Sequence, residues 1–202
     1  MRKTKEDAAV TREKLLDVAL SVFSKKGYSA TTLEDIAKEA GVTRGAIYWH
    51  FGSKSELYSS LVKEYSSRGN LIAQQAIEEG GSIIEIIRRI FIRILSSIED
   101  DSKLRAMMEL SLFKTELAPE LTADRQAQIK TGRSLIEGIS QAIQRGIESG
   151  ELRSDLDPSG IARAFMAYQN GAIYLWLIDP DSFSLKESAG LFVDIFMEGI
   201  TP

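Results

Sequence analysis

The chain contains no cysteine and only one histidine among its 202 residues. Without cysteine it can form neither a disulfide framework nor a thiolate metal site. One histidine also excludes a histidine-rich metal site, so we expect no metal and no cofactor. No apolar run reaches the roughly 20 residues that a membrane-spanning helix needs. The basic start of the chain, Met1–Lys5, lacks the apolar segment that follows in a targeting signal. These absences predict a cytoplasmic protein that does not enter a membrane.

The usual sequence signals of enzymes are missing as well. There is no glycine-rich phosphate loop, no nucleophile elbow and no second histidine to serve as a base. The paired carboxylates Glu78–Glu79 and Asp100–Asp101 fall at expected helix ends, where they are typical of solvated turns. We therefore expect a protein that is not an enzyme.

Charge is unevenly distributed along the chain. Residues 1–68 carry 12 lysines and arginines against nine acidic residues, whereas residues 69–202 carry 13 against 20. The net charge of −4 therefore divides into +3 for the first part and −7 for the second. A positive field in one segment is what phosphate binding needs. The first segment is the candidate for binding nucleic acid, and the basic arm at residues 1–10 either reaches the DNA or is a solvated tail.

The hydrophobic pattern is helical throughout, with no strand pattern, and predicts an all-α fold of about nine helices. Helix starts are marked by caps, such as Ser82 with Glu85, Asp157 before Pro158, and Ser184 with Glu187. The expected helices cover residues 11–26, 33–40, 44–51, 53–79, 83–99, 102–117 and 122–149, then a helix from 158 and one over 185–200.

Two short helices joined by a glycine turn are the most specific feature. Thr32 is a good N-cap with Asp35 three residues later, which is the capping-box arrangement. Gly41 follows the first helix where a left-handed residue is needed, and Thr43 can cap a second helix that ends near Phe51. This layout predicts a helix-turn-helix whose second helix enters the DNA major groove.

The outer face of the second helix is unusual for a solvent surface. It combines small residues, which allow close approach to base edges, with an aromatic run and an arginine near the helix start. Considered one at a time, the aromatic residues could be packing residues and the histidine an ordinary surface residue, but as a set they favour DNA contact. The predicted DNA-binding residues are Thr32, Thr43, Arg44, Gly45, Ala46, Tyr48, Trp49, His50 and Lys54.

The spacing of Gly27-Tyr28, Thr31-Thr32, Ile36-Ala37, Ala40-Gly41-Val42, Gly45, Tyr48-Trp49-His50-Phe51, Lys54 and Leu57 resembles the DNA-binding domain of TetR-family repressors. The similarity is ungapped over about residues 11–60. The stretches Arg145–Leu152 and Trp176–Glu187 further resemble the AcrR/TtgR-type branch, the regulators of multidrug efflux pumps. The resemblance implies a flexible basic arm (1–10), a helix-turn-helix domain (11–55) and a ligand-binding and dimerisation domain (56–202).

The last two helices are apolar on nearly all sides, which predicts burial on all sides. In so short a chain, the second buried face is most simply a subunit interface, and two such helices from each protomer form a four-helix bundle. The alternative is that both helices are internal to a monomer. The predicted interface residues are Tyr168, Leu175, Trp176, Phe192 and Phe196. A twofold dimer would bind a palindromic double-stranded DNA operator.

The resemblance also implies a pocket inside the helices between the fourth (residues 53–79) and the eighth (from residue 158), where polar residues on apolar helices would orient a ligand. The candidates are Phe91, Glu109, Phe113, Ile136, Ile139, Phe165, Gln169 and Asn170. A buried Glu109 among aromatic rings would suit a small, lipophilic, cationic effector. Alternatively, Glu109 is exposed, Phe113 and Phe165 are core residues, and Gln169 and Asn170 bond across the dimer.

We predict a ligand-responsive transcriptional repressor, controlling an efflux pump or a similar operon. Effector binding would shift the helix that begins at residue 53 and change the separation of the two recognition helices. The effector must then bind the two states with different free energies. The alternative is a DNA-binding protein without ligand regulation, either architectural or an activator.

Overall fold

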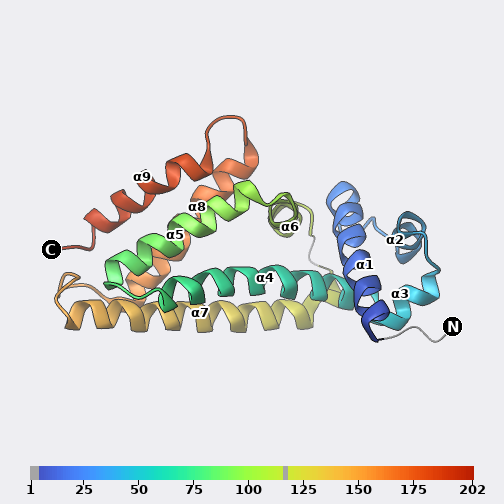
Figure 1. Ribbon diagram of the computed structural model, residues 1–202, viewed down its shortest axis with the longest axis horizontal. Coiled ribbons are helices and arrows are strands. Elements are labelled where there is room, and N and C mark those ends of the chain that lie inside the picture. Colours follow the sequence, from blue (N-terminus) through green and yellow to red (C-terminus); the bar gives the residue numbers. More distant parts are fainter. Residues whose placement is uncertain (1–4, 116–117) are drawn as a thin grey trace. The chain divides into compact units, whose positions relative to one another are not determined.

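The computed structural model describes residues 5–115 and 118–202, and all regular secondary structure in this part of the chain is helical (Figure 1). The helices are α1 (Lys5–Lys26), α2 (Leu33–Ala40), α3 (Arg44–Phe51), α4 (Lys54–Glu78), α5 (Ile83–Asp100), α6 (Ser102–Phe113), α7 (Thr122–Glu148), α8 (Pro158–Ile178) and α9 (Leu185–Glu198), with a short 3₁₀ turn at Pro119–Leu121. The all-α prediction is confirmed.

The chain divides into two compact units. The first unit consists of residues 1–67 and 102–124, and the second of residues 68–101 and 125–202. The first unit is larger than the domain predicted for residues 11–55, because α6 packs against α1 and contributes the buried Met107 and Leu110 to the same core. That packing joins segments far apart in the sequence, which helix periodicity alone does not reveal.

The core of the first unit fixes the positions of α2 and α3. Ile36 of α2, Ile47 of α3 and Leu57 of α4 are fully buried in one apolar cluster. Phe23 of α1 stacks on Tyr28 with ring centroids 5.7 Å apart, and Tyr58 of α4 meets Tyr28 edge-on at 5.1 Å. The short helices are therefore held by packing on α1 and α4 rather than by their own helix propensity.

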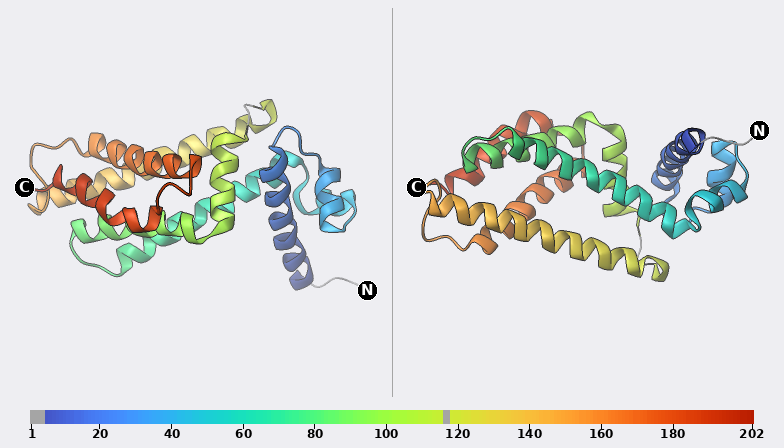
Figure 2. Two further views of the ribbon diagram at one scale, coloured as in Figure 1. Left: turned by 90° about the horizontal axis from the view of Figure 1, so that it is seen from above. Right: turned by 60° about the horizontal axis from the view of Figure 1, so that its bottom comes forward.

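In the second unit, α5 packs along α9 and both contact α8 (Figures 1 and 2). Phe91 and Leu95 of α5, Val193 of α9 and Ile173 and Trp176 of α8 are buried. Other apolar side chains of the last two helices remain outside this core. They form an exposed set that we name the α8–α9 apolar face: Tyr174, Leu175, Ile178, Leu191 and Ile195.

Most helix ends agree with the predicted caps. Thr32 with Asp35 and Ser82 with Glu85 form complete capping boxes, and Asp157 accepts from the backbone N–H groups of Ser159 and Gly160. The start of α1 differs: it begins at Lys5 rather than Thr11, so residues 5–10 are helical rather than part of a flexible arm. Residues 1–4 of that arm lie outside the described residues. Across the described chain, no helix has the length and apolar content needed to cross a bilayer.

Candidate functional site

The turn between α2 and α3 is specified by local hydrogen bonds. At the start of α2, the Thr32 hydroxyl accepts from the Asp35 N–H at 3.1 Å, and the Asp35 carboxylate accepts from the Thr32 N–H at 2.9 Å. Gly41 ends α2 with φ 68°, a left-handed conformation that a residue with Cβ adopts only with strain. Thr43 then caps α3 by accepting from the Ala46 N–H at 3.3 Å. The helix-turn-helix geometry thus follows from residues adjacent in sequence.

An ion pair reinforces the start of α2. Lys26, at the end of α1, donates to the Asp35 carboxylate at 2.7 Å. This hydrogen bond, together with the one from the Thr32 N–H, holds the pKa of Asp35 well below its usual value. Asp35 is therefore ionised at neutral pH, where a negative charge at a helix N-terminus is also favourable.

The outer face of α3 exposes two large aromatic side chains. Trp49 is 74% exposed and Tyr48 is 43% exposed, whereas Ile47 of the same helix is fully buried in the core. The His50 ring lies edge-on to Trp49 with centroids 4.6 Å apart. The small residues Gly45 and Ala46, predicted to allow close approach of DNA, lie on the same short helix, exposed and half-buried respectively.

Arg44 and Tyr48 form a pair one helical turn apart. The Arg44 guanidinium donates to the Tyr48 hydroxyl at 2.8 Å, and its central carbon lies 5.2 Å from the centroid of the same ring. The hydrogen bond that Arg44 donates to Tyr48 raises the pKa of Arg44 above its ordinary value. The pair places a permanent positive charge beside the aromatic surface of α3.

Lys54 has a role that the sequence reading did not predict. Its ammonium donates to the carbonyl oxygens of Tyr28, Ser29 and Thr31 at 3.1, 3.5 and 3.0 Å, and lies 4.3 Å from the centroid of the Tyr28 ring. It therefore ties the start of α4 to the turn between α1 and α2. Contact of Lys54 with a DNA phosphate stays a prediction, and such a contact would compete with these carbonyl groups.

The sequence reading also missed Arg12. Its guanidinium carbon lies 5.0 Å from the centroid of the Phe51 ring, so α1 brings an exposed cation to the end of α3. The two residues are 39 positions apart, and no local pattern links them. Arg12 joins Arg44 as a basic side chain near α3.

The candidate ligand residues do not all lie together. Phe91 and Phe165 are buried in the second unit and meet with ring centroids 5.7 Å apart, and Tyr168 stacks on Phe91 at 6.0 Å. The buried Gln169 is also in this unit, and Ile136 and Ile139 are half-buried on α7.

The other three ligand candidates are placed differently. Asn170 is exposed in the single chain although its neighbour Gln169 is buried, because successive residues of a helix point about 100° apart. Contact of Asn170 with a ligand, or across the dimer, stays a prediction. Glu109 and Phe113 belong to α6 in the first unit, where Glu109 is half-buried and Phe113 is 43% exposed. Phe113 is therefore neither a core residue nor enclosed in a buried pocket.

The residues predicted at the dimer interface also differ from one another in exposure. Leu175 is 62% exposed and belongs to the α8–α9 apolar face. Trp176 is only 2% exposed within the single chain, because its side chain is covered by the core, and its place at a subunit interface stays a prediction. Phe196 stacks on Tyr168 at 6.0 Å, Phe192 meets Tyr168 edge-on at 6.3 Å, and all three are half-buried.

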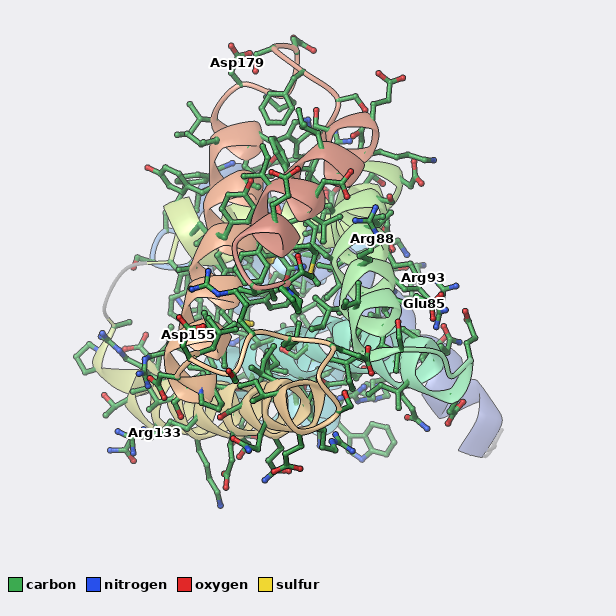
Figure 3. All side chains as sticks on the ribbon, turned by 90° about the vertical axis from the view of Figure 1, so that its left-hand side faces the viewer. Glu85, Arg88, Arg93, Arg133, Asp155 and Asp179 are labelled. Carbon is green, nitrogen blue, oxygen red and sulfur yellow. The ribbon has the colours of Figure 1, made fainter. Side chains whose placement is uncertain are left out.

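Polar groups elsewhere in the second unit have structural roles. Arg88 of α5, labelled in Figure 3, forms an ion pair with Asp194 of α9, and Arg93 makes two hydrogen bonds to Glu79 at 2.6 and 2.9 Å.

A depression of about 510 Å³ lies between α7 and the start of α8, lined by Ser140, Gln141, Gln144, Arg145, Asp157, Pro158 and Ser159. It includes none of the predicted ligand residues. Among the residues whose side chains the structure describes, no three acidic or histidine side chains gather as metal ligands would.

Comparisons with known proteins bear on both parts of the chain. Residues 15–61 match the family model of bacterial regulatory proteins of the tetR family, and residues 83–201 match that of the C-terminal region of MAATS-type transcriptional repressors. The HTH-type transcriptional regulator AcrR of Shigella flexneri is 38% identical over 198 residues, which cover 98% of this chain and 92% of the relative.

Two solved structures are similar over nearly the whole chain. NalD, the secondary repressor of the MexAB-OprM multidrug efflux pump in Pseudomonas aeruginosa, superposes with a TM-score of 0.87 at 26% identity and covers 98% of each chain. The complex of SmeT with triclosan has a TM-score of 0.83 at 27% identity, covering 96% of this chain and 92% of that one. SmeT is the repressor of the multidrug efflux pump SmeDEF of Stenotrophomonas maltophilia.

Proposed function

The chain belongs to the tetR family of bacterial regulatory proteins, and from this membership we propose that it represses the operon of a multidrug efflux pump. It is a transcriptional regulator of the AcrR-like branch rather than an enzyme. The relatives NalD and SmeT are repressors of efflux pumps, which supports the proposed target. We place its action in the cytoplasm, where the DNA is.

The observation that carries the proposal is the exposed aromatic face of α3. A tryptophan that is 74% exposed on a helix fixed by the buried Ile47 is costly to solvate and well placed to contact a partner. Arg44 and Arg12 supply positive charge on the same helix and at its end. Phosphate contacts would position α3, and base-edge contacts from its small and aromatic residues would supply specificity.

The α8–α9 apolar face supports a twofold dimer. Five large apolar residues remain 45% to 62% exposed on two adjacent helices, which is an arrangement that a second copy would cover. Two helices from each protomer would then form a four-helix bundle. Such a dimer would present its two α3 helices to half-sites one helical turn of DNA apart, about 34–36 Å, or a multiple of that distance.

The proposed effector is a small lipophilic molecule that binds among the aromatic side chains of the second unit. The SmeT complex with triclosan supports an effector of this kind. A cationic effector would require a buried carboxylate, and Glu109 is only half-buried on α6 of the other unit. Effector binding would be coupled to DNA release through α4, a single helix whose residues 54–67 belong to the first unit and 68–78 to the second.

Footprinting of the DNA upstream of the gene and its neighbours, at physiological salt with excess competitor, tests the proposal. We expect a protected palindrome whose protection is lost when a lipophilic effector is added. Protection that no tested compound relieves would favour the alternative of a DNA-binding protein without ligand regulation. Diffuse, strongly salt-dependent retention would contradict sequence-specific repression.

A further inference from the structure

Gln169 is a buried polar residue on an otherwise apolar face. It is 4% exposed and lies on the buried stripe of α8 with Phe165, Ala172, Ile173 and Trp176. Its amide nitrogen Nε2 has no hydrogen-bond partner among the described residues. A buried donor without an acceptor is unfavourable, because it has lost its hydrogen bonds to water and forms none within the protein.

The surroundings of this amide are aromatic. Phe165 lies one helical turn before Gln169 on the same stripe and is 5% exposed, and its ring meets the fully buried Phe91 of α5. Among the described residues, the only other polar residue classed as buried is Thr31, which belongs to the first unit. Gln169 Nε2 is therefore a buried donor of the second unit that has no partner among the described residues and that a ligand could pair with.

We propose that Gln169 Nε2 donates a hydrogen bond to the effector and thereby selects neutral aromatic molecules that carry an acceptor oxygen. This inference rests on the proposed function, because it assigns the chemical class of the proposed effector. A carbonyl, ether or phenolic oxygen would complete the amide's hydrogen bonding, and aromatic rings would pack on Phe91 and Phe165.

The same surroundings disfavour two other classes of ligand. A cation would face the positive end of an N–H dipole with no buried carboxylate among the described residues to compensate its lost hydration. A pure hydrocarbon would contact the aromatic side chains but leave the amide unpaired. Discrimination of this kind is large, since a site that hydrogen-bonds a ligand rejects the analogue lacking the partner atom.

Three probes of nearly equal shape separate these classes. Benzophenone carries a carbonyl oxygen between two rings, diphenylmethane carries a methylene there, and aminodiphenylmethane carries an ammonium group at neutral pH. Affinities would be measured by calorimetric titration of the full-length protein. We expect benzophenone to bind at least about ten-fold more tightly than either analogue.

The variant Gln169→Met keeps the side-chain volume and removes the donor. We expect it to abolish the preference for benzophenone over diphenylmethane, whereas Gln128→Met, at an exposed position on α7, should leave the preference intact. Equal binding of benzophenone and diphenylmethane by the wild-type protein, or a preference that persists in Gln169→Met, would overturn the inference. Failure of all three probes to bind would overturn it too.

Operator binding by the same preparation distinguishes this inference from the proposed function. A protein that protects its operator but does not discriminate between the probes contradicts only the assignment of Gln169. A protein that folds, as judged by its circular dichroism, but protects no DNA contradicts the proposed function itself.

Discussion

Replacing Trp49 by alanine should separate DNA binding from folding. Because the side chain is 74% exposed, its removal withdraws little buried surface from the core. The contact that remains to be lost is the edge-on packing with His50 at 4.6 Å. Aromatic pairs contribute about 0.5–1.5 kcal/mol when well packed, and an exposed pair contributes at the lower end. We therefore expect the free energy of unfolding to fall by less than about 1 kcal/mol.

The effect on operator affinity should be much larger. A tryptophan at the centre of an interface typically contributes about 2 kcal/mol or more. In a twofold dimer the side chain is lost once from each half-site, so the total loss is about 4 kcal/mol. Since about 1.4 kcal/mol corresponds to a factor of ten, affinity should decrease about 10³-fold.

Fluorescence anisotropy with a labelled operator, at one fixed salt concentration, would measure this change, and thermal unfolding would monitor the fold. Ile47→Ala is the matched control, because Ile47 is fully buried on the opposite side of the same helix. That variant should lose about 2–5 kcal/mol of stability. If Trp49→Ala folded normally and bound the operator with wild-type affinity, the assignment of the outer face of α3 to DNA would be refuted.

Three further predictions concern other parts of the structure. Lys54→Met should lower the free energy of unfolding by about 1–3 kcal/mol in chemical denaturation, because three carbonyl groups lose a charged donor; unchanged stability would contradict its structural role. Asp35→Asn should lower the melting temperature at pH 7. Because the folded-state pKa of Asp35 is depressed, its contribution to stability is present above the ordinary aspartate pKa of 3.8 and is lost as the pH falls below that value. The difference between Asp35→Asn and wild type should therefore shrink in acid, and a constant difference would argue against the ion pair with Lys26. Leu175→Arg should yield a folded monomer in sedimentation, since this residue is 62% exposed on the α8–α9 apolar face; a retained dimer would exclude this face as the interface.

The parts of the fold that could be predicted from sequence are those with local causes. The bounds of α2 and α3 depend on Thr32, Gly41 and Thr43, which act on backbone groups within a few residues. The start of α1 was missed although the helix itself was found. Thr11 has the chemistry of an N-cap, but the helix continues back to Lys5 through residues that can equally well be helical.

The rest depends on contacts between distant segments. Nearly every face of α8 is apolar, so periodicity could not show that Trp176 points into the core while Leu175 next to it points out. Likewise, the three acceptors of Lys54 are backbone carbonyl groups 23 to 26 residues away, and backbone groups leave no trace in a sequence. Gln169 is buried and Glu109 is half-buried, and both results depend on how the helices pack against one another.

The hydrogen bond from Arg44 to Tyr48 bears on the entropy of DNA recognition. Both residues belong to α3, so the helix restricts their rotamers when the chain folds. Immobilising a long side chain at an interface costs about 0.5–1.5 kcal/mol, and part of this ordering has already taken place when the chain folds. A guanidinium held over a ring is also a rigid, planar group rather than a mobile charge. The exposed face of α3 is thus preorganised, and in the proposed complex with DNA this would favour slow dissociation from a matching operator over indiscriminate attraction to any DNA.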